Sequence, residues 1–427
     1  MSIKKIYELF KKHNSVSIDS RIIKSDDIFF AIKGPNFDGN NFALQALRNG
    51  ASYVVSDNPT IKEKSDKIIY VNDSIEALQK LANYHRKELN TKIIAITGSN
   101  GKTTSKELIL NVLKSKYNTI ATEGNLNNHL GVPLSLLKMN KNTEFGIIEM
   151  GANQLNEIAQ LCKIAEPDFG YITNFGNAHL EGFKSLEGVI KAKSELYNYL
   201  INVNNVIFFN SENKKQATLI NGYENTFSFG YSSQSNCIIN KSLFENTVDV
   251  IYQNKMIKST IYGEYNFENI CIAIAIGEYF NVGFNQIKKG IENYLPDNNR
   301  SQITLKNSNT IILDAYNANP TSMNLAIESF SKTSYTNKMI IVGDMFELGK
   351  DSNKHHQEII NSLEELEKTI IYIVGKDFCK TKHSNKIKSF YSTNELINNL
   401  SETNVKDCSI LIKGSRAMQL EKIIEFI

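Results

Sequence analysis

Short runs of β-branched and aromatic residues recur along the chain, and each ends in Gly, Asp, Asn or Ser before a stretch with helical periodicity. A strand that is buried on both faces is apolar at consecutive positions, so these runs predict parallel strands joined by helices, the pattern of an α/β protein. In the first unit, which ends near residue 90, the expected strands are 27–32, 53–55 and 68–71, and the expected helices are about 42–50 and 74–89.

A second unit begins with another buried strand, and its expected strands are 93–96, 146–148, 169–172 and 206–209. Between 226 and 262 polar and apolar residues alternate, which predicts an antiparallel patch, and a helix is expected after Gly263. The third unit has expected strands at 310–313, 339–342, 370–374 and 409–412, separated by helices in a Rossmann-like order. The sequence therefore predicts three domains, residues 1–90, 91–297 and 298–427.

Composition and charge narrow the class of protein. The 427 residues are 41% hydrophobic and 22% charged, which is typical of a globular chain. A formal net charge of +3 is too small for a surface that binds nucleic acid or an anionic membrane. The N-terminus lacks the apolar run of a signal peptide, and no run approaches about 18 apolar residues, so we expect a soluble cytoplasmic protein without a membrane span. The five scattered cysteines, without a Cys-x-x-Cys pair, are typical of buried free thiols.

The most informative motif, Gly98-Ser-Asn-Gly-Lys-Thr-Thr104, lies between a buried strand and an expected helix. Glycines let backbone N–H groups converge on phosphate oxygens, and the helix N-terminus adds its positive dipole end. Lys102 would then reach the β- and γ-phosphates, and the Thr103 hydroxyl would bind Mg²⁺. Two residues separate the glycines instead of the usual four, but the flanking strand and helix favour an ATP site over a ligand-free turn. The residues expected to bind ATP in this loop are Gly98, Ser99, Asn100, Gly101, Lys102, Thr103 and Thr104.

Two further polar side chains follow strands of the same unit. Glu149 ends one strand, and His179 follows the next. Ligands of open α/β sheets bind beyond the carboxyl ends of the strands, and Mg²⁺ prefers carboxylate, hydroxyl and water oxygens. A lone histidine is more often a surface or hydrogen-bonding residue. Because His179 is expected at the same sheet edge as Glu149, a metal site is the better interpretation.

These motifs, together with others along almost the whole chain, resemble those of the Mur ligase family, which also includes folylpolyglutamate synthetase. The other matching segments are Glu123-Gly-Asn-Leu-Asn-Asn128, Glu149-Met-Gly-Ala152, Thr173-Asn-Phe-Gly-Asn-Ala-His-Leu-Glu-Gly182, Asp314-Ala-Tyr-Asn-Ala-Asn-Pro320, Gly343-Asp-Met-Phe-Glu-Leu-Gly349 and Lys413-Gly-Ser-Arg416. The resemblance implies that the first domain binds a UDP-sugar, the second binds ATP and two Mg²⁺ ions, and the third binds the amino substrate.

The resemblance also implies a reaction. The γ-phosphoryl group of ATP activates a carboxylate as an acyl phosphate, an amine attacks it, and ADP and phosphate are released. The segment Asp314–Pro320 resembles the corresponding segment in one branch of the family. That branch adds D-alanyl-D-alanine to UDP-N-acetylmuramoyl-tripeptide in peptidoglycan precursor synthesis. Uncharged amides at Asn317 and Asn319 suit a small dipeptide, whereas a tripeptide-forming relative has arginine where Thr321 stands here. A monomer is expected.

Residue roles follow from the same resemblance. Catalytic roles fall to Lys102, Glu149, His179, Lys193 and Lys413, and further ATP contacts to Asn266, Asn269, Arg300 and Asp314. The two asparagines stand one helical turn apart, so that both amides can face one base. Substrate contacts fall to Ser20, Arg21, Asn125, Asn127, Asn128, Asn317, Asn319 and Ser415. Thr103, Glu149, His179 and a carbamylated Lys193 would hold the metals, although the sequence alone favours an exposed helix lysine at Lys193. We do not expect a metal at His355-His356, which has no third ligand nearby.

Other functions remain open at the level of sequence. Within the same chemistry, the chain could add a different amino acid, or could be a folylpolyglutamate synthetase. A plain phosphate-loop NTPase or small-molecule kinase would leave the third domain and residues 19–42 without a role. A catalytically inactive nucleotide-binding scaffold would not need Lys102, Glu149, His179 and Lys193. The sequence leaves the third residue of the stem peptide undetermined.

Overall fold

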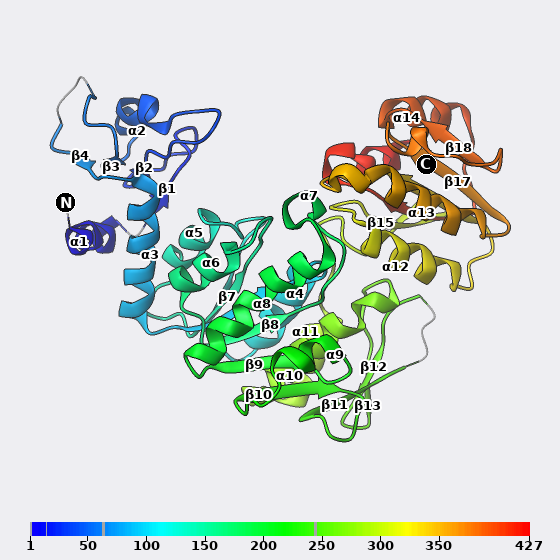
Figure 1. Cartoon of the computed structure of the whole chain (residues 1–427), viewed down its shortest axis with the longest axis horizontal. Coiled ribbons are helices and arrows are strands. Elements are labelled where there is room, and N and C mark those ends of the chain that lie inside the picture. Colours follow the sequence, from blue (N-terminus) through cyan, green and yellow to red (C-terminus); the bar gives the residue numbers. More distant parts are fainter. Residues whose placement is uncertain (1, 14, 62–64, 243–245) are drawn as a thin grey trace.

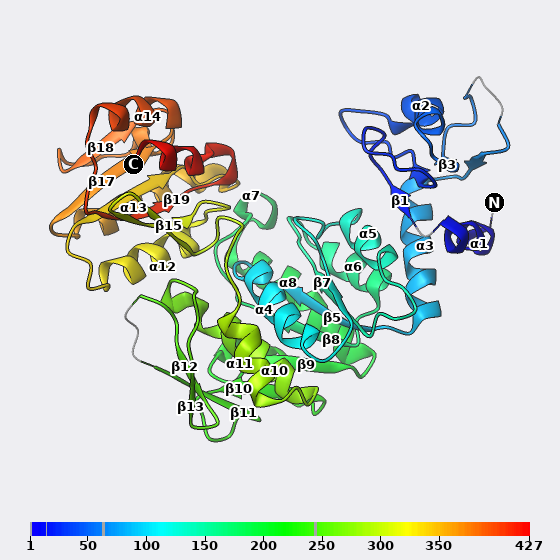
Figure 2. The same cartoon turned by 180° about the vertical axis from the view of Figure 1, so that it is seen from behind.

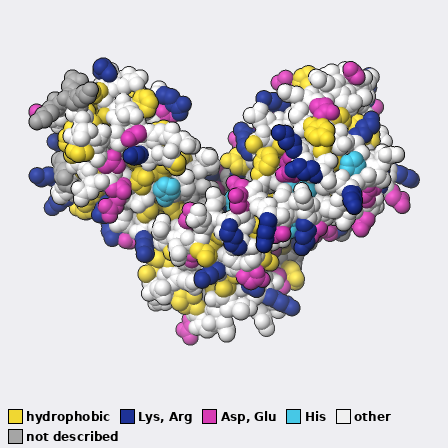
Figure 3. Space-filling model, turned by 45° about the horizontal axis from the view of Figure 1, so that its top comes forward, with side chains coloured by type: hydrophobic (Ala, Val, Ile, Leu, Met, Phe, Trp, Pro, Cys, Tyr) yellow, Lys and Arg dark blue, Asp and Glu magenta, His cyan; other side chains and the backbone are white. Residues whose placement is uncertain are grey.

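The computed structural model describes residues 2–13, 15–61, 65–242 and 246–427. It has three lobes, each built on one β-sheet, with the N-terminal and C-terminal lobes on either side of the middle lobe (Figure 1). From another direction the molecule is hollowed between the two outer lobes (Figure 3). The expected α/β architecture is confirmed.

The N-terminal lobe carries a four-stranded parallel sheet in the order β1-β2-β3-β4. Its elements are α1 (Ile3–His13), β1 (Val16–Ser17), β2 (Ile28–Phe30), α2 (Ala43–Arg48), β3 (Tyr53–Ser56), β4 (Ile68–Tyr70) and α3 (Ser74–Leu89). Helix α3 begins at the cap residue Asp73, whose side chain accepts a hydrogen bond from the Glu76 N–H. It also connects this lobe to the next, because Arg86 forms a 2.7 Å ion pair with Asp168 of the middle lobe.

The middle lobe has a nine-stranded sheet in the order β13-β12-β11-β10-β9-β8-β5-β7-β6. The strands are β5 (Lys92–Thr97), β6 (Thr119–Ala121), β7 (Phe145–Glu149), β8 (Phe169–Ile172), β9 (Val206–Asn210), β10 (Thr226–Gly230), β11 (Cys237–Lys241), β12 (Val250–Tyr252) and β13 (Lys255–Ile257). The helices are α4 (Lys102–Lys114), α5 (Gly131–Leu137), α6 (Glu157–Ala165), α7 (Leu180–Phe183), α8 (Leu186–Asn202), α9 (Lys214–Leu219), α10 (Phe267–Tyr279) and α11 (Phe284–Glu292). Helices α4, α10 and α11 lie on one face of this sheet, and α5, α6 and α8 lie on the other (Figure 2). Their apolar side chains pack against the two faces.

The antiparallel patch is smaller than the sequence indicates. Strand β10 pairs parallel with β9, and β11 pairs parallel with β10, so among the described strands of this patch the antiparallel pairs are β11 with β12 and β12 with β13. The reason is the helix α9 between β9 and β10, which returns the chain to the start of the sheet and lets β10 run in the same direction as β9. Residues 243–245 of the expected patch lie outside the described residues.

The C-terminal lobe has a six-stranded sheet in the order β14-β15-β19-β16-β17-β18, parallel except for β14. Its elements are β14 (Gln302–Lys306), β15 (Asn309–Asp314), α12 (Pro320–Ser331), β16 (Lys338–Gly343), α13 (Ser352–Glu364), β17 (Thr369–Val374), β18 (Ile387–Phe390), α14 (Thr393–Glu402) and β19 (Ser409–Lys413). The four expected strands are present as β15, β16, β17 and β19, while β14 and β18 were not expected. In the part of the chain that the structure describes, no helix is long and apolar enough to span a membrane.

Candidate active site

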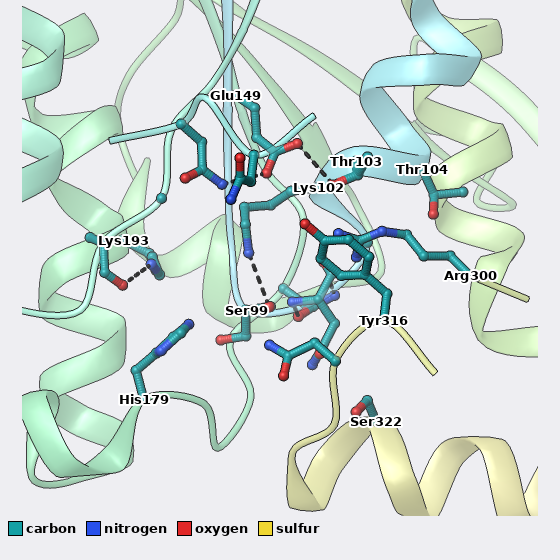
Figure 4. A pocket seen from close by; sticks show the side chains of 18 of the residues that line it. Ser99, Lys102, Thr103, Thr104, Glu149, His179, Lys193, Arg300, Tyr316 and Ser322 are labelled. Atoms are coloured by element: carbon teal, nitrogen blue, oxygen red, sulfur yellow. Dashed lines mark hydrogen bonds between the residues drawn. The ribbon is translucent and has the colours of Figure 1, made fainter. Parts of the chain in front are cut away.

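A cavity of about 600 Å³ lies where the parallel sheets of the middle and C-terminal lobes both end (Figure 4). Glu149 ends β7, Asp314 ends β15 and Lys413 ends β19, and all three line it. The carboxyl ends of two open α/β sheets therefore share one cavity, which is where such sheets bind ligands. The site residues expected from the sequence that line it are Ser99, Asn100, Gly101, Lys102, Thr103, Thr104, Asn125, Asn127, Asn128, Glu149, His179, Lys193, Asn266, Asn269, Arg300, Asp314, Asn317 and Lys413.

The phosphate loop connects β5 to α4 in the way the sequence predicts. Gly98 has a φ of +142° and Gly101 a φ of +77°, and a Cβ on Gly98 would overlap the Thr173 hydroxyl, so a residue without a side chain is required there. The Lys102 ammonium donates hydrogen bonds to the carbonyls of Gly98 (2.7 Å) and Ser99 (3.1 Å). Burial lowers the Lys102 pKa to about 8; the nearby charge of Arg300 acts in the same direction, and Glu149 opposes both.

The carboxylate of Glu149 lies beside this loop and is 2% exposed. The Thr103 hydroxyl donates to one of its oxygens (2.9 Å), and the Asn127 amide donates to the other (2.8 Å). A hydroxyl and a carboxylate at this spacing supply the oxygen donors that Mg²⁺ prefers. No group of three His, Cys, Asp or Glu side chains suited to a metal occurs among the described residues, so a magnesium ion would need phosphate or water oxygens as well.

His179 contacts the C-terminal lobe. Its φ is +52°, a left-handed conformation that is rare for a residue other than glycine and is often found at functional sites. The imidazole Nδ1 forms a hydrogen bond with the Glu347 carboxylate, and the Glu181 N–H donates to the Glu347 carbonyl at 3.1 Å. The hydrogen bond to His179 lowers the Glu347 pKa. Glu347 lies in the segment Gly343–Gly349, which the sequence singled out without giving this residue a role.

Lys193 is buried, with 1% of its surface exposed, and its ammonium donates to the Ala152 carbonyl (3.2 Å) at the wall of the cavity. Burial, and after it the charge of Lys102, lower its pKa to about 7, while the nearby carboxylates of Glu157 and Glu195 act in the opposite direction. The interpretation of Lys193 as an exposed helix lysine, which sequence alone favours, is therefore wrong. Lys191, two residues earlier on α8, is exposed. The amphipathic pattern missed the difference because α7 and the chain around Ala152 cover this part of the helix.

The two asparagines at the start of α10 bind each other. The side-chain amide of Asn269 donates to the Asn266 side-chain oxygen Oδ1 (2.7 Å), and its own Oδ1 accepts from the Ser105 hydroxyl (2.9 Å). Asn266 in turn donates to the Ser301 hydroxyl (2.9 Å). From the sequence we expected the amides of Asn266 and Asn269 to face one base. In the structure several hydrogen-bonding groups of these two amides already have protein partners.

Asp314 and Lys413 form a buried ion pair with a Nζ–Oδ2 distance of 2.6 Å. The register explains it, because these two residues are directly opposite each other where the neighbouring strands β15 and β19 end. The sequence placed both residues in the site, but it could not indicate that they would pair.

Five expected site residues do not line this cavity, namely Ser20, Arg21, Gly98, Asn319 and Ser415. Ser20 and Arg21 lie in the N-terminal lobe, where Arg21 is exposed and pairs with Asp19 at 2.6 Å. The Ser415 hydroxyl is buried and accepts a hydrogen bond from the Phe346 N–H (3.1 Å). Gly98 contributes its carbonyl to Lys102.

Asn319 begins helix α12 as its cap residue and also contacts the phosphate loop. Its side-chain oxygen accepts from the Ser322 N–H, and its amide donates to the Asn100 side chain at 2.7 Å. Asn128 has a similar local contact, since its side chain accepts from the N–H groups of Leu130 and Gly131. Both side chains are thus bonded to protein groups in the structure, and the ligand contacts expected of them stay predictions.

Three models of one family match successive parts of the chain: "Mur ligase family, catalytic domain" at residues 12–86, "Mur ligase middle domain" at 96–277, and "Mur ligase, glutamate ligase domain" at 299–416. The phosphate loop and the cavity between two sheet edges fall within the second and third matches. The chain belongs to the Mur ligase family.

Similar proteins in this family have a more specific name. The "UDP-N-acetylmuramoyl-tripeptide--D-alanyl-D-alanine ligase" of Bacillus subtilis is 33% identical over 96% of this chain and 92% of its own length. A crystal structure of MurF from Acinetobacter baumannii matches with a TM-score of 0.86 and 30% identity over 96% of this chain and 92% of that one. The MurF ligase from Thermotoga maritima in complex with ADP matches with a TM-score of 0.84 and 28% identity over 97% of both chains.

Proposed function

We propose that this protein is an ATP-dependent ligase that joins D-alanyl-D-alanine to UDP-N-acetylmuramoyl-tripeptide, with release of ADP and phosphate. The observation that carries the proposal is the shared cavity, because cationic groups from two lobes, Lys102 on one side and Arg300 on the other, line it together. The names of the full-length relatives support the choice of substrates. The product would be a peptidoglycan precursor made in the cytoplasm, and we expect a monomer.

The residues on the middle-lobe side of the cavity would bind the nucleotide. The phosphate loop presents backbone N–H groups and the N-terminus of α4, and Lys102 adds a positive charge. We propose that Thr103 and Glu149 hold one Mg²⁺ ion, and that His179 and a carbamate on Lys193 hold a second. Magnesium supplies Lewis-acid neutralisation of phosphate charge when it is bound. The burial and low pKa of Lys193 support a neutral amine at physiological pH, which is the form that reacts with carbon dioxide.

The chain's own part in the reaction is to orient the reactants and to neutralise charge. A carboxylate becomes an electrophile only after the γ-phosphoryl group is transferred to it, and Lys102 and Arg300 stabilise the charge of the phosphoryl group that moves. The dipeptide amine then attacks the acyl phosphate and phosphate leaves. Asn317 and Lys413 lie on the C-terminal-lobe wall, and we propose that the amino substrate binds against this wall.

The division of roles among the domains is part of the proposal. Residues 1–90 would bind the UDP-sugar, 91–297 ATP and the metals, and 298–427 the dipeptide. Ser20 and Arg21 would contact the UDP-sugar in the N-terminal lobe, while Asn125, Asn127 and Asn128 would contact the muramoyl group. In the structure the Asn127 amide donates a hydrogen bond to the Glu149 carboxylate (2.8 Å).

The test is ADP release with UDP-N-acetylmuramoyl-tripeptide and Mg²⁺, with and without an amino substrate. D-Alanyl-D-alanine should stimulate release strongly, while meso-diaminopimelate and glutamate should not. Stimulation by glutamate or diaminopimelate instead would identify a ligase with a different amino substrate. ADP release without any amine, with stable transfer of phosphate to another molecule, would identify a kinase.

A further inference from the structure

The ring of Tyr316, at the wall of the cavity, lies next to the guanidinium groups of Arg300 and Arg416. The Arg300 Cζ is 3.7 Å from the centre of the ring, and the Arg416 Cζ is 5.6 Å from the same centre. Both distances are within the range of cation–π attraction, and the shorter one indicates close contact. Tyr316 lies two residues after the end of β15, and Figure 4 shows it and Arg300 together beside the phosphate loop.

The two arginines differ in their other partners. Arg416 pairs with the Glu421 carboxylate at 3.4 Å and is mostly exposed. Among the described residues Arg300 has no acidic partner, and its Nε atom is buried without a hydrogen bond. A buried N–H donor without a partner carries a desolvation cost, which an anionic ligand in the cavity would remove.

The surroundings of Arg300 are positively charged. Its charge contributes to lowering the pKa of Lys102, so the two cations are close enough to repel each other. A carboxylate beside Arg300 would relieve this repulsion, but it would also compete with phosphate for the guanidinium. An aromatic face instead fixes the plane of the guanidinium and leaves its charge and its N–H donors available.

We propose that Tyr316 is a positioning residue that holds the Arg300 guanidinium against its ring and so presents it to the phosphate groups of a bound nucleotide. The inference rests on the proposed function, in which this cavity binds ATP. Tyr316 acts through Arg300, so its removal affects ligands that carry phosphate and leaves the affinity for the nucleoside alone largely unchanged.

The experiment measures equilibrium binding of ADP and of adenosine by titration calorimetry on the full-length protein. Tyr316→Leu should weaken ADP binding about 3- to 30-fold and should change adenosine binding less than twofold. Tyr316→Phe retains the aromatic face and should restore most of the ADP affinity. Tyr391→Leu removes an exposed tyrosine of the C-terminal lobe and is the matched control for loss of a tyrosine.

Coupling between the two residues provides the second measurement. Arg300→Gln should weaken ADP binding, and adding Tyr316→Leu should cause little further loss, because the ring then has no guanidinium to hold. Equal losses for ADP and adenosine, or losses that multiply in the double variant, would overturn the inference while leaving the proposed function intact. If the wild-type protein binds no ADP, the proposed function fails and the inference fails with it. Tyr316→Met gives the same comparison if the leucine variant does not fold.

Discussion

Carbamylation of Lys193 can be tested directly, because the structure predicts how much reactive amine is present. Carbon dioxide reacts with the neutral amine, and the reaction forms an N–C bond and releases one proton. With a pKa lowered from 10.5 to about 7, roughly half of the Lys193 side chains are neutral at pH 7. An exposed lysine with the ordinary pKa is neutral in only about 1 molecule in 3,000 at this pH. Lys193 therefore has on the order of 1,000 times more reactive amine.

The assay is carbon-13 NMR of the protein in labelled bicarbonate between pH 6 and pH 9. We expect one lysine carbamate signal in the wild type, and a decrease as the pH falls below about 7, because the amine then becomes protonated. Lys193→Arg should abolish the signal, whereas Lys191→Arg, at an exposed position of the same helix, should retain it.

Activity gives a second, independent result for the same residue. Lys193→Ala should lose nearly all ligase activity, and a small carboxylate at high concentration should restore part of it by replacing the missing carbamate oxygens. Lys191→Ala should have close to wild-type activity. A wild-type protein without a Lys193-dependent carbamate signal, or a Lys193→Arg variant with near-normal rates, would refute the reasoning.

Three further predictions concern the rest of the site. Lys102→Ala should reduce ADP release at least 100-fold with an unchanged circular dichroism spectrum, because the ammonium faces the phosphate loop and not a core; activity within tenfold of the wild type would remove Lys102 from the mechanism. The protein should use D-alanyl-D-alanine and reject meso-diaminopimelate, since neutral Asn317 lines the cavity; equal rates with both amines would contradict this role. ATP with the UDP-substrate should reduce the radius of gyration in small-angle X-ray scattering, because ligands that contact several lobes would close the hollow between the outer ones; an unchanged radius would argue against closure (Figure 3).

Local sequence determined the phosphate loop and the strands that are covered on both faces. Runs such as 93–96 and 339–342 are apolar at every position because both faces of their sheets are covered, and this property depends on the run itself. The glycines at 98 and 101 were identifiable for a similar reason, since the loop needs backbone conformations that other residues rarely adopt. Strand β14 was missed because it lies at a sheet edge, where its residues are mostly half-buried and no continuous apolar run is needed.

Only the tertiary structure decided which polar groups meet. The Asp314–Lys413 pair depends on the register of two strands about 100 residues apart in the chain, and the contact of His179 with Glu347 depends on how two lobes pack. The same holds for Lys193, whose burial and lowered pKa arise from chain segments that cover one turn of α8. Hydrophobic periodicity records which side of a helix faces its own sheet, but it carries no information about a neighbouring loop or lobe. Contacts between residues distant in sequence set the electrostatics of this site, and for that reason they had to be read from the fold.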